Sequence, residues 1–102
     1  MRTFDQVLMN VVSWGYQRKI IENGKPLTQS IKTLEEVTEL ISAINRKDDA
    51  EIKDAVGDVM VTLAMICAQL DIDMVDCFAG AYEVIKDRKG YLRADGMFIK
   101  EQ

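Results

Sequence analysis

The stretch Ile31–Ile44, with the sequence IKTLEEVTELISAI, decides the fold class because its apolar residues recur at helical spacing. This pattern predicts a helix over about residues 27–46 with one buried face. The apolar stripe consists of Ile31, Leu34, Val37, Leu40, Ile41 and Ile44. Glu35, Glu36 and Glu39 follow one edge of this stripe, and we expect an edge position to let their side chains reach a cleft.

The segments on either side of this helix are helical as well. The segment Asn23-Gly24-Lys25-Pro26 is typical of a helix end followed by a turn, so a first helix is predicted over about residues 3–22. Asp48 is the predicted N-cap of a third helix, which runs to about residue 70. From Ala55 onward this helix is apolar on nearly every side, which predicts that it is central.

The C-terminal part of the chain predicts one more helix and a short tail. A fourth helix is expected over about residues 74–89, with Gly90 as its C-cap. Asp95-Gly96 lies between short apolar segments and indicates a short hairpin. The sequence therefore predicts an all-α, four-helix bundle in a single domain over residues 1–102, with a C-terminal hairpin or irregular tail.

Composition excludes several classes of partner. The chain has 102 residues, of which 48% are hydrophobic and 29% charged, as expected for a soluble globular protein. No apolar run reaches the roughly 18 residues of a membrane span, and no apolar segment of a secretory signal follows Arg2. A cytoplasmic protein without a membrane partner is predicted. The net charge of -4 argues against broad binding to nucleic acid.

The chain contains no histidine, which narrows the possible chemistry. Catalysis by Ser-His or Cys-His pairs and the usual zinc sites are excluded. Carboxylates, lysine, tyrosine or a metal-bound water remain as acid-base groups.

Carboxylates on the second and third helices are expected to face one another. Glu51, Asp54 and Asp58 fall within an arc of about 60° at about 100° per residue. A short connection makes the two helices antiparallel, so that Asp54 and Asp58 lie opposite Glu36 and Glu39. Hard cations such as Mg²⁺ prefer carboxylate oxygens, phosphates and water, so this arrangement predicts a magnesium site for work on a phosphorylated ligand.

Each carboxylate also has a structural interpretation. A cluster of glutamates in an acidic helical protein is usually a solvated face, and Asp48-x-x-Glu51 resembles a capping box. Glu51 lies about 7 Å from the level of Glu39 and is the less certain ligand. Asp58 precedes a long apolar run and is the strongest single ligand, because an isolated buried carboxylate is costly.

The motifs Glu35-Glu36-x-x-Glu39 and Glu51-x-x-Asp54-x-x-Gly57-Asp58 resemble those of MazG-like all-α nucleotide pyrophosphohydrolases, especially small phage and bacterial members. The likeness extends to Trp14, to Lys32-Thr33-Leu34 and to the segment 81–90. The chain departs from the family pattern at one position. Ala55 stands where the wider family has a glutamate, so Asp54 or the pair Glu51 and Asp54 would take its place.

The resemblance implies hydrolysis of a nucleoside triphosphate, either a dNTP or a non-canonical NTP, to the monophosphate and pyrophosphate. Mg²⁺ is the implied cofactor, and Mn²⁺ would substitute for it. The implied metal ligands are Glu35, Glu36, Glu39, Glu51, Asp54 and Asp58. One of four implied catalytic residues would orient or deprotonate the attacking water: Glu35, Glu36, Glu39 or Asp58.

Candidate substrate contacts lie on three helices. Lys32, Lys86 and Arg88 are candidates for phosphate binding, although basic residues at the end of a helix also complement its dipole. Trp14 is a candidate for stacking on a base, and its alternative is a place in the core.

A homo-oligomer, either a dimer or a tetramer, is expected because a chain of this length can bury only a modest share of its surface. Two other functions remain open. One is a non-catalytic module that binds metal or nucleotide and lost catalysis through the change at Ala55. The other is a structural oligomerisation bundle with acidic faces.

Overall fold

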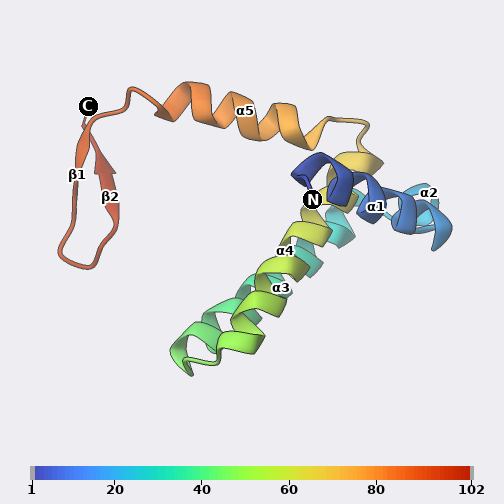
Figure 1. Ribbon diagram of the computed structural model, residues 1–102, viewed down its shortest axis with the longest axis horizontal. Coiled ribbons are helices and arrows are strands. Elements are labelled where there is room, and N and C mark those ends of the chain that lie inside the picture. Colours follow the sequence, from blue (N-terminus) through green and yellow to red (C-terminus); the bar gives the residue numbers. More distant parts are fainter. Residues whose placement is uncertain (1, 102) are drawn as a thin grey trace.

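The computed structural model describes residues 2–101, so the first and last residues of the predicted domain lie outside the described range. Within that range the chain forms five helices and a two-stranded antiparallel hairpin (Figure 1). The elements are α1 (Phe4–Gln17), α2 (Ile20–Asn23), α3 (Pro26–Asn45), α4 (Asp49–Gln69), α5 (Met74–Ile85), β1 (Gly90–Leu92) and β2 (Phe98–Lys100). The predicted all-α class and the C-terminal hairpin are both confirmed.

Helices α3 and α4 form a long antiparallel pair. The Asp48 carboxylate caps α4 by accepting the backbone N–H of Glu51 at 3.2 Å, as predicted for this aspartate. Farther along the pair, the hydroxyl of Thr33 donates to Oγ1 of Thr62 at 2.8 Å. This contact fixes the helices in the register that the short connection predicts, and so confirms it.

Helix α4 is the central element, because α1, α2, α3 and α5 all pack against it. The core lies around Met65, which is fully buried and forms a cluster with the buried residues Ala64 and Ile21. Gly15 lets α1 cross close to α4, since a Cβ atom at this position would lie 2.6 Å from Sδ of Met65. The predicted central helix is therefore confirmed.

The predicted first helix, over residues 3–22, is two helices in the structure. Lys19 adopts a left-handed backbone conformation, with φ 62°, and separates α1 from α2. The redirected chain brings Ile21 into the core. A lysine gives no compositional signal for such a turn, so the helical periodicity concealed the break.

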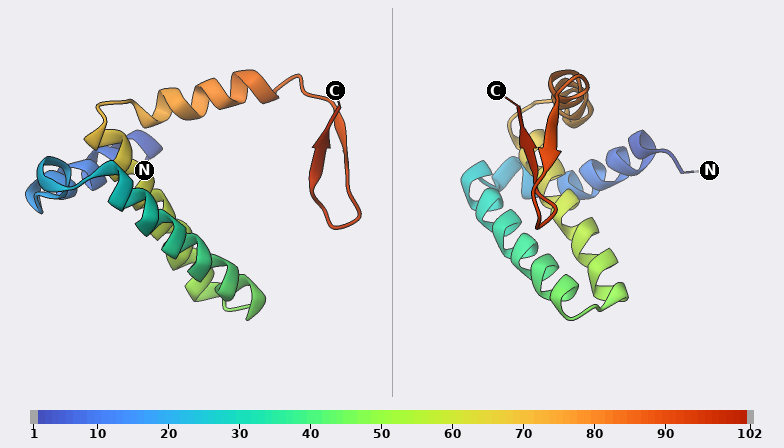
Figure 2. Two further views of the ribbon diagram at one scale, coloured as in Figure 1. Left: turned by 180° about the vertical axis from the view of Figure 1, so that it is seen from behind. Right: turned by 90° about the vertical axis from the view of Figure 1, so that its left-hand side faces the viewer.

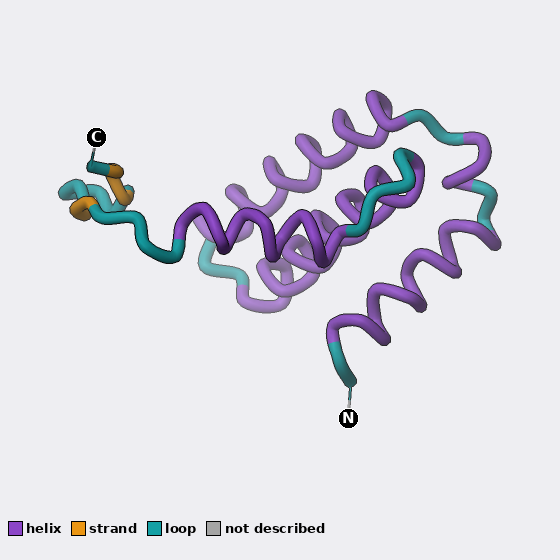
Figure 3. Tube along the Cα trace, turned by 90° about the horizontal axis from the view of Figure 1, so that it is seen from above, coloured by secondary structure: helices purple, strands orange, loops and turns teal. Residues whose placement is uncertain are grey.

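Helix α5 is shorter than predicted and points away from the rest of the chain. It ends at Ile85, and Gly90 is the first residue of β1 instead of a C-cap, lying close to the carbonyl oxygen of Ile99. A bend of 107° separates α5 from α4, and no residue of α5 is buried. Figures 2 and 3 show the hairpin at the far end of α5, away from α3 and α4.

The apolar stripe of α3 is only partly covered. Val37 and Leu40 are half-buried, but Leu34 and Ile41 are 66% and 63% exposed. The buried residues of α3 are Glu36 and Ala43, so α4 covers the edge of the stripe and not its centre. The prediction that the whole stripe is buried is therefore wrong for a single chain.

Among the described residues, no single helix is both long and apolar enough to cross a membrane. Helices α4 and α5 pass this test of length and composition only when they are joined, and the 107° bend lies between them.

Candidate metal and nucleotide site

Glu36 is the buried carboxylate of the α3–α4 pair. It is only 8% exposed, and its Oε1 lies 3.4 Å from Nζ of Lys32, one helical turn earlier. Its Oε2 is buried and has no hydrogen-bond partner in the described part of the chain. A buried, unpartnered carboxylate oxygen is costly, so this atom is a good candidate for a cation ligand.

Two further carboxylates, those of Glu39 and Asp58, have raised pKa values. The negative charge of Glu36 is the main cause that raises the pKa of Glu39, and Asp58 contributes to the same shift. Burial raises the pKa of Asp58, followed by the charges of Asp54 and Glu36. Four predicted ligands from α3 and α4 therefore lie within electrostatic reach of one another, and a cation among them would relieve their repulsion.

Two hollows are lined by these carboxylates together with other predicted site residues. Trp14, Lys32, Glu36 and Asp58 line a hollow of 480 Å³ between α1, α3 and α4. Around the α3–α4 pair, a smaller hollow of 270 Å³ is lined by Glu39, Ser42, Arg46, Glu51, Asp54 and Ala55. The first hollow combines an aromatic ring, a cation and two carboxylates, which are the groups that a nucleotide with its metal would require.

The donor set fits a hard cation, although the side chains do not enclose one as they stand. Within residues 2–101, no group of three or more Asp, Glu, Cys or His side chains converges closely enough to hold a metal ion. Mg²⁺ usually keeps several water ligands and is held by one or two carboxylates together with substrate phosphates. The unpartnered oxygen of Glu36, with Glu39 and Asp58 nearby, meets this requirement for oxygen donors.

The other predicted residues lie farther out. Glu35 is exposed and its carboxylate is 3.4 Å from Nζ of Lys32. Lys86 pairs with Glu83 at 2.7 Å on α5. Arg88 follows α5, and neither it nor Lys86 lines a hollow that contains the carboxylates. Within one chain, the structure does not bring these two basic residues to the site.

A pair of hydroxyl groups that the sequence did not predict lies next to the carboxylates. Thr62 is 4% exposed, accepts the hydrogen bond of Thr33 and donates to the carbonyl oxygen of Val59 at 2.7 Å. Thr33 and Thr62 stand one helical turn from Glu36 and Asp58, respectively. The pair could have been predicted from the antiparallel register, because this register places the two polar residues opposite each other on otherwise apolar surfaces.

The comparisons with known proteins match the same part of the molecule. The family model of the MazG nucleotide pyrophosphohydrolase domain matches residues 25–92, which contain all six candidate metal ligands. The chain belongs to the MazG family. This match covers α3, α4, α5 and β1, so Trp14 on α1 lies before it.

One curated relative of this MazG chain is an uncharacterised 18.2 kDa protein encoded in the rep-hol intergenic region of Haemophilus phage HP1 (strain HP1c1). The two are 33% identical over 75 residues, which is 74% of this chain and 46% of the relative. The chain thus spans about half the length of this relative. No solved structure matches the chain.

Proposed function

We propose that this MazG chain hydrolyses a nucleoside triphosphate, a dNTP or a non-canonical NTP, to the monophosphate and pyrophosphate in the presence of Mg²⁺. Mn²⁺ would substitute for Mg²⁺. The family supports pyrophosphohydrolysis of nucleotides in general. The observation that carries the proposal is the buried, unpartnered oxygen of Glu36 beside Glu39 and Asp58.

In this proposal the carboxylates of α3 and α4 hold the metal. Its ligands are drawn from Glu35, Glu36, Glu39, Glu51, Asp54 and Asp58. When bound, Mg²⁺ supplies positive charge that neutralises the triphosphate. Glu36 is buried and lies beside Lys32, whereas Glu39 is exposed. One carboxylate of Glu35, Glu36, Glu39 or Asp58 orients or deprotonates the attacking water.

The substrate is proposed to lie in the hollow between α1, α3 and α4. Lys32 contacts phosphate oxygens, and Trp14, which is 40% exposed, offers its ring to the base. Lys86 and Arg88 could contact the phosphates of the same site only from a second copy, because α5 leads away from α3.

We also propose that the functional protein is a homo-oligomer, either a dimer or a tetramer. The radius of gyration of the single chain is 16.0 Å, whereas that of a compact chain of this length is about 13 Å. The difference, together with the exposed apolar residues of α3 and α5, supports association of several copies.

The experiment is to incubate the protein with a panel of nucleoside triphosphates and Mg²⁺ and to assay pyrophosphate and orthophosphate separately. The expected result is pyrophosphate from at least one nucleotide, with no release when EDTA removes the metal. Orthophosphate as the first product would indicate a different phosphohydrolase.

Binding without turnover would support the second candidate, a module that binds metal or nucleotide. Mg²⁺ would then raise the unfolding temperature of the protein, although no nucleotide is consumed. A protein that neither binds metal nor turns over nucleotide would leave the structural bundle as the remaining function.

A further inference from the structure

Lys32 places a positive charge among the carboxylates of the α3–α4 pair. Its Nζ lies 3.4 Å from Oε2 of Glu35 and 3.4 Å from Oε1 of Glu36. The same charge reaches across the pair, where it partly offsets the rise in the pKa of Glu39 and of Asp58. Lys32 is therefore a counter-ion for predicted metal ligands on both helices.

Stabilisation of α3 is a poor explanation for this placement. A lysine four residues before a glutamate has the less favourable orientation in a helix, because the reverse order complements the helix dipole. The side chain of Lys32 is 54% exposed, and both of its ion pairs measure 3.4 Å. Exposed ion pairs of this kind contribute little to stability, so a competing anion can replace them.

Glu36 is the carboxylate for which Lys32 and a metal ion would compete. One of its oxygens, Oε1, faces the ammonium group of Lys32. The other, Oε2, is buried and has no hydrogen-bond partner in the described part of the chain. A divalent cation at Oε2 would lie close to the ammonium group, and the two positive charges would repel each other. Lys32 in its present position therefore opposes the binding of a cation at Glu36.

The ammonium group has a second position within reach. Lys32 lines the 480 Å³ hollow between α1, α3 and α4 together with Glu36 and Asp58. The backbone of α3 is held at this level, because Thr33 donates its hydrogen bond to Thr62 on α4. Lysine has a flexible four-carbon side chain. The ammonium group can therefore turn from the carboxylates to a phosphate in the hollow while the helices stay in place.

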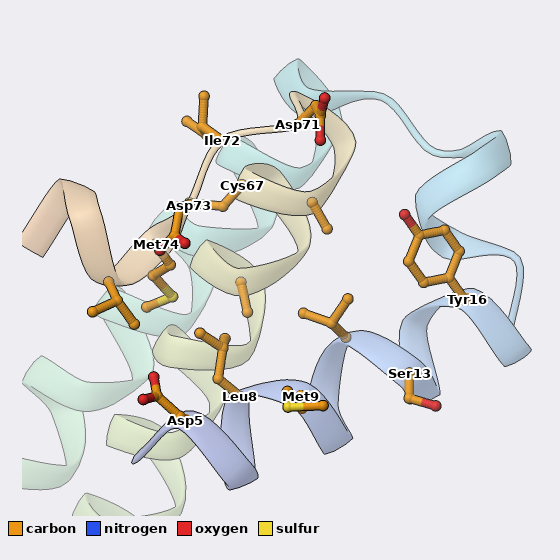
Figure 4. Close-up of a pocket in the computed structure, with 14 residues that line it drawn as sticks. Asp5, Leu8, Met9, Ser13, Tyr16, Cys67, Asp71, Ile72, Asp73 and Met74 are labelled. Carbon is orange, nitrogen blue, oxygen red and sulfur yellow. The ribbon is translucent and has the colours of Figure 1, made fainter.

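A second acidic hollow has no such counter-ion. It measures 620 Å³, and Asp5, Asp71 and Asp73 line it, but its described lining contains no lysine or arginine (Figure 4). All three aspartates are exposed, and Asp73 caps α5 by accepting the backbone N–H of Asp76 at 3.0 Å. Water solvates these carboxylates, whereas the buried Glu36 needs a cation.

We propose that Lys32 is an exchangeable counter-ion: its ammonium group neutralises Glu35 and Glu36 until a metal-bound nucleotide enters, and then moves to a phosphate oxygen of that nucleotide. The carboxylate of Glu36 is thereby released to the metal ion. Lys32 in this way opposes a metal ion that arrives alone and favours one that arrives with phosphates. The proposal rests on the proposed function, since it takes the α3–α4 carboxylates as the metal ligands.

The first test measures the binding of free Mn²⁺ to the full chain by electron paramagnetic resonance, without nucleotide. Lys32→Gln should tighten Mn²⁺ binding by about tenfold, because the metal ion no longer competes with the ammonium group. Lys32→Arg keeps the positive charge and should not tighten binding. Circular dichroism verifies that the variants fold.

Lys25→Gln is the matched control for this test. It makes the same change in net charge as Lys32→Gln at the start of the same helix. The side chain of Lys25 makes no capping hydrogen bond, and it forms no ion pair within residues 2–101. The Mn²⁺ affinity of this variant should stay within about threefold of wild type.

The second test uses inorganic tripolyphosphate at saturating Mg²⁺ as a probe for the phosphate groups of the nucleotide. Lys32→Gln should weaken tripolyphosphate binding by about tenfold in calorimetric titrations, because the ammonium group is no longer present to bind a phosphate oxygen. Lys25→Gln should again stay close to wild type. Opposite changes in the affinities for metal and phosphate distinguish an exchangeable counter-ion from a structural ion pair, whose loss would not produce them.

Three results would overturn the inference, and one of them would overturn the proposed function as well. If wild type binds Mn²⁺ and Lys32→Gln binds it equally or more weakly, the metal site stands but Lys32 is not its counter-ion. Tighter Mn²⁺ binding without loss of tripolyphosphate binding would show that the ammonium group does not move to phosphate. If neither protein binds Mn²⁺, the α3–α4 pair holds no metal ion, and both the inference and the proposed function fail.

Discussion

Helices α3 and α4 close on each other within one chain, whereas α5 carries a stripe of similar spacing and has no surface to close on. The hydroxyl bond between Thr33 and Thr62 fixes the first pair, and Glu36 is buried between its helices. Helix α5 packs mainly against the end of α4, with Met74 at the edge of the core, and buries no residue. The carboxylates, which need a fixed geometry, therefore lie where one chain completes its own packing. The remaining apolar surface is available for association.

The largest predicted effect is the loss of pyrophosphate release when a carboxylate of the α3–α4 pair is replaced. Glu36→Gln, Glu39→Gln and Asp58→Asn should each lower metal-dependent pyrophosphate release by more than the roughly 10- to 100-fold typical of losing an outer partner of a metal ligand. These substitutions keep the size of the side chain and remove its charge. The measurement is the initial rate at saturating Mg²⁺.

Glu83→Gln on α5 is the matched control and should retain the wild-type rate, because Glu83 is exposed and pairs only with Lys86 in the described chain. Removing charge at Glu39 or Asp58 should also raise the unfolding temperature of the metal-free protein, since like charges raise the pKa of both groups. A variant with near wild-type turnover would exclude its residue from the ligand set.

A smaller effect is expected from loosening the register of α3 and α4. Thr62→Val removes the buried hydroxyl at nearly constant volume and should lower the free energy of unfolding by about 1–2 kcal/mol. It should also weaken Mg²⁺ binding. Val84→Ser in α5 should cost less than about 0.5 kcal/mol in a single chain, because α5 has no packed face there. Urea unfolding measures both, and equal losses would contradict the contrast between the two regions.

The turn between α3 and α4 gives the next effect. Asp48→Ala should cost about 1 kcal/mol, because the carboxylate caps the backbone N–H of Glu51. Glu51→Gln keeps that backbone bond and should cost less in stability, while its effect on turnover tests whether Glu51 is a ligand. If Glu51→Gln were the more destabilising of the two, the Glu51 side chain would have a capping role of its own.

The smallest effect is on the pH dependence of stability. Raised folded-state pKa values mean that folded Glu39 and Asp58 bind protons more tightly than the unfolded chain does. The metal-free protein should therefore lose stability as pH rises from the ordinary carboxyl values, 4.5 and 3.8, through the raised ones. Comparing unfolding temperatures with those of the Glu39→Gln, Asp58→Asn double variant isolates this contribution. A double variant with the same pH profile would contradict it.

The sequence predicts the α3–α4 pair well, because the sequence patterns that specify this pair are local. Helical spacing defines α3 and α4, Asp48 marks the start of α4, and a short connection requires antiparallel packing. The register follows, and with it the placement of Asp58 opposite the glutamates of α3. Glu36 was not singled out as the most buried carboxylate, because its burial depends on where α4 lies across the stripe.

The other region could not be predicted to the same extent. The break at Lys19 depends on tertiary packing of Ile21, and the early end of α5 gives way to a hairpin that begins at Gly90. Periodicity shows that α5 has an apolar face, but it contains no information on whether the same chain or another copy covers that face. The position of Lys86 and Arg88 relative to the site depends on that answer.

The role of Glu36 is tested most directly by ³¹P NMR of a nucleoside triphosphate that the wild-type protein consumes, recorded with Mg²⁺ for the wild type and for Glu36→Gln. The wild-type protein should give the signals of monophosphate and pyrophosphate, and Glu36→Gln of verified fold should leave the triphosphate spectrum unchanged. Equal pyrophosphate formation by the two proteins would contradict the claim that the buried carboxylate between α3 and α4 is part of the catalytic site.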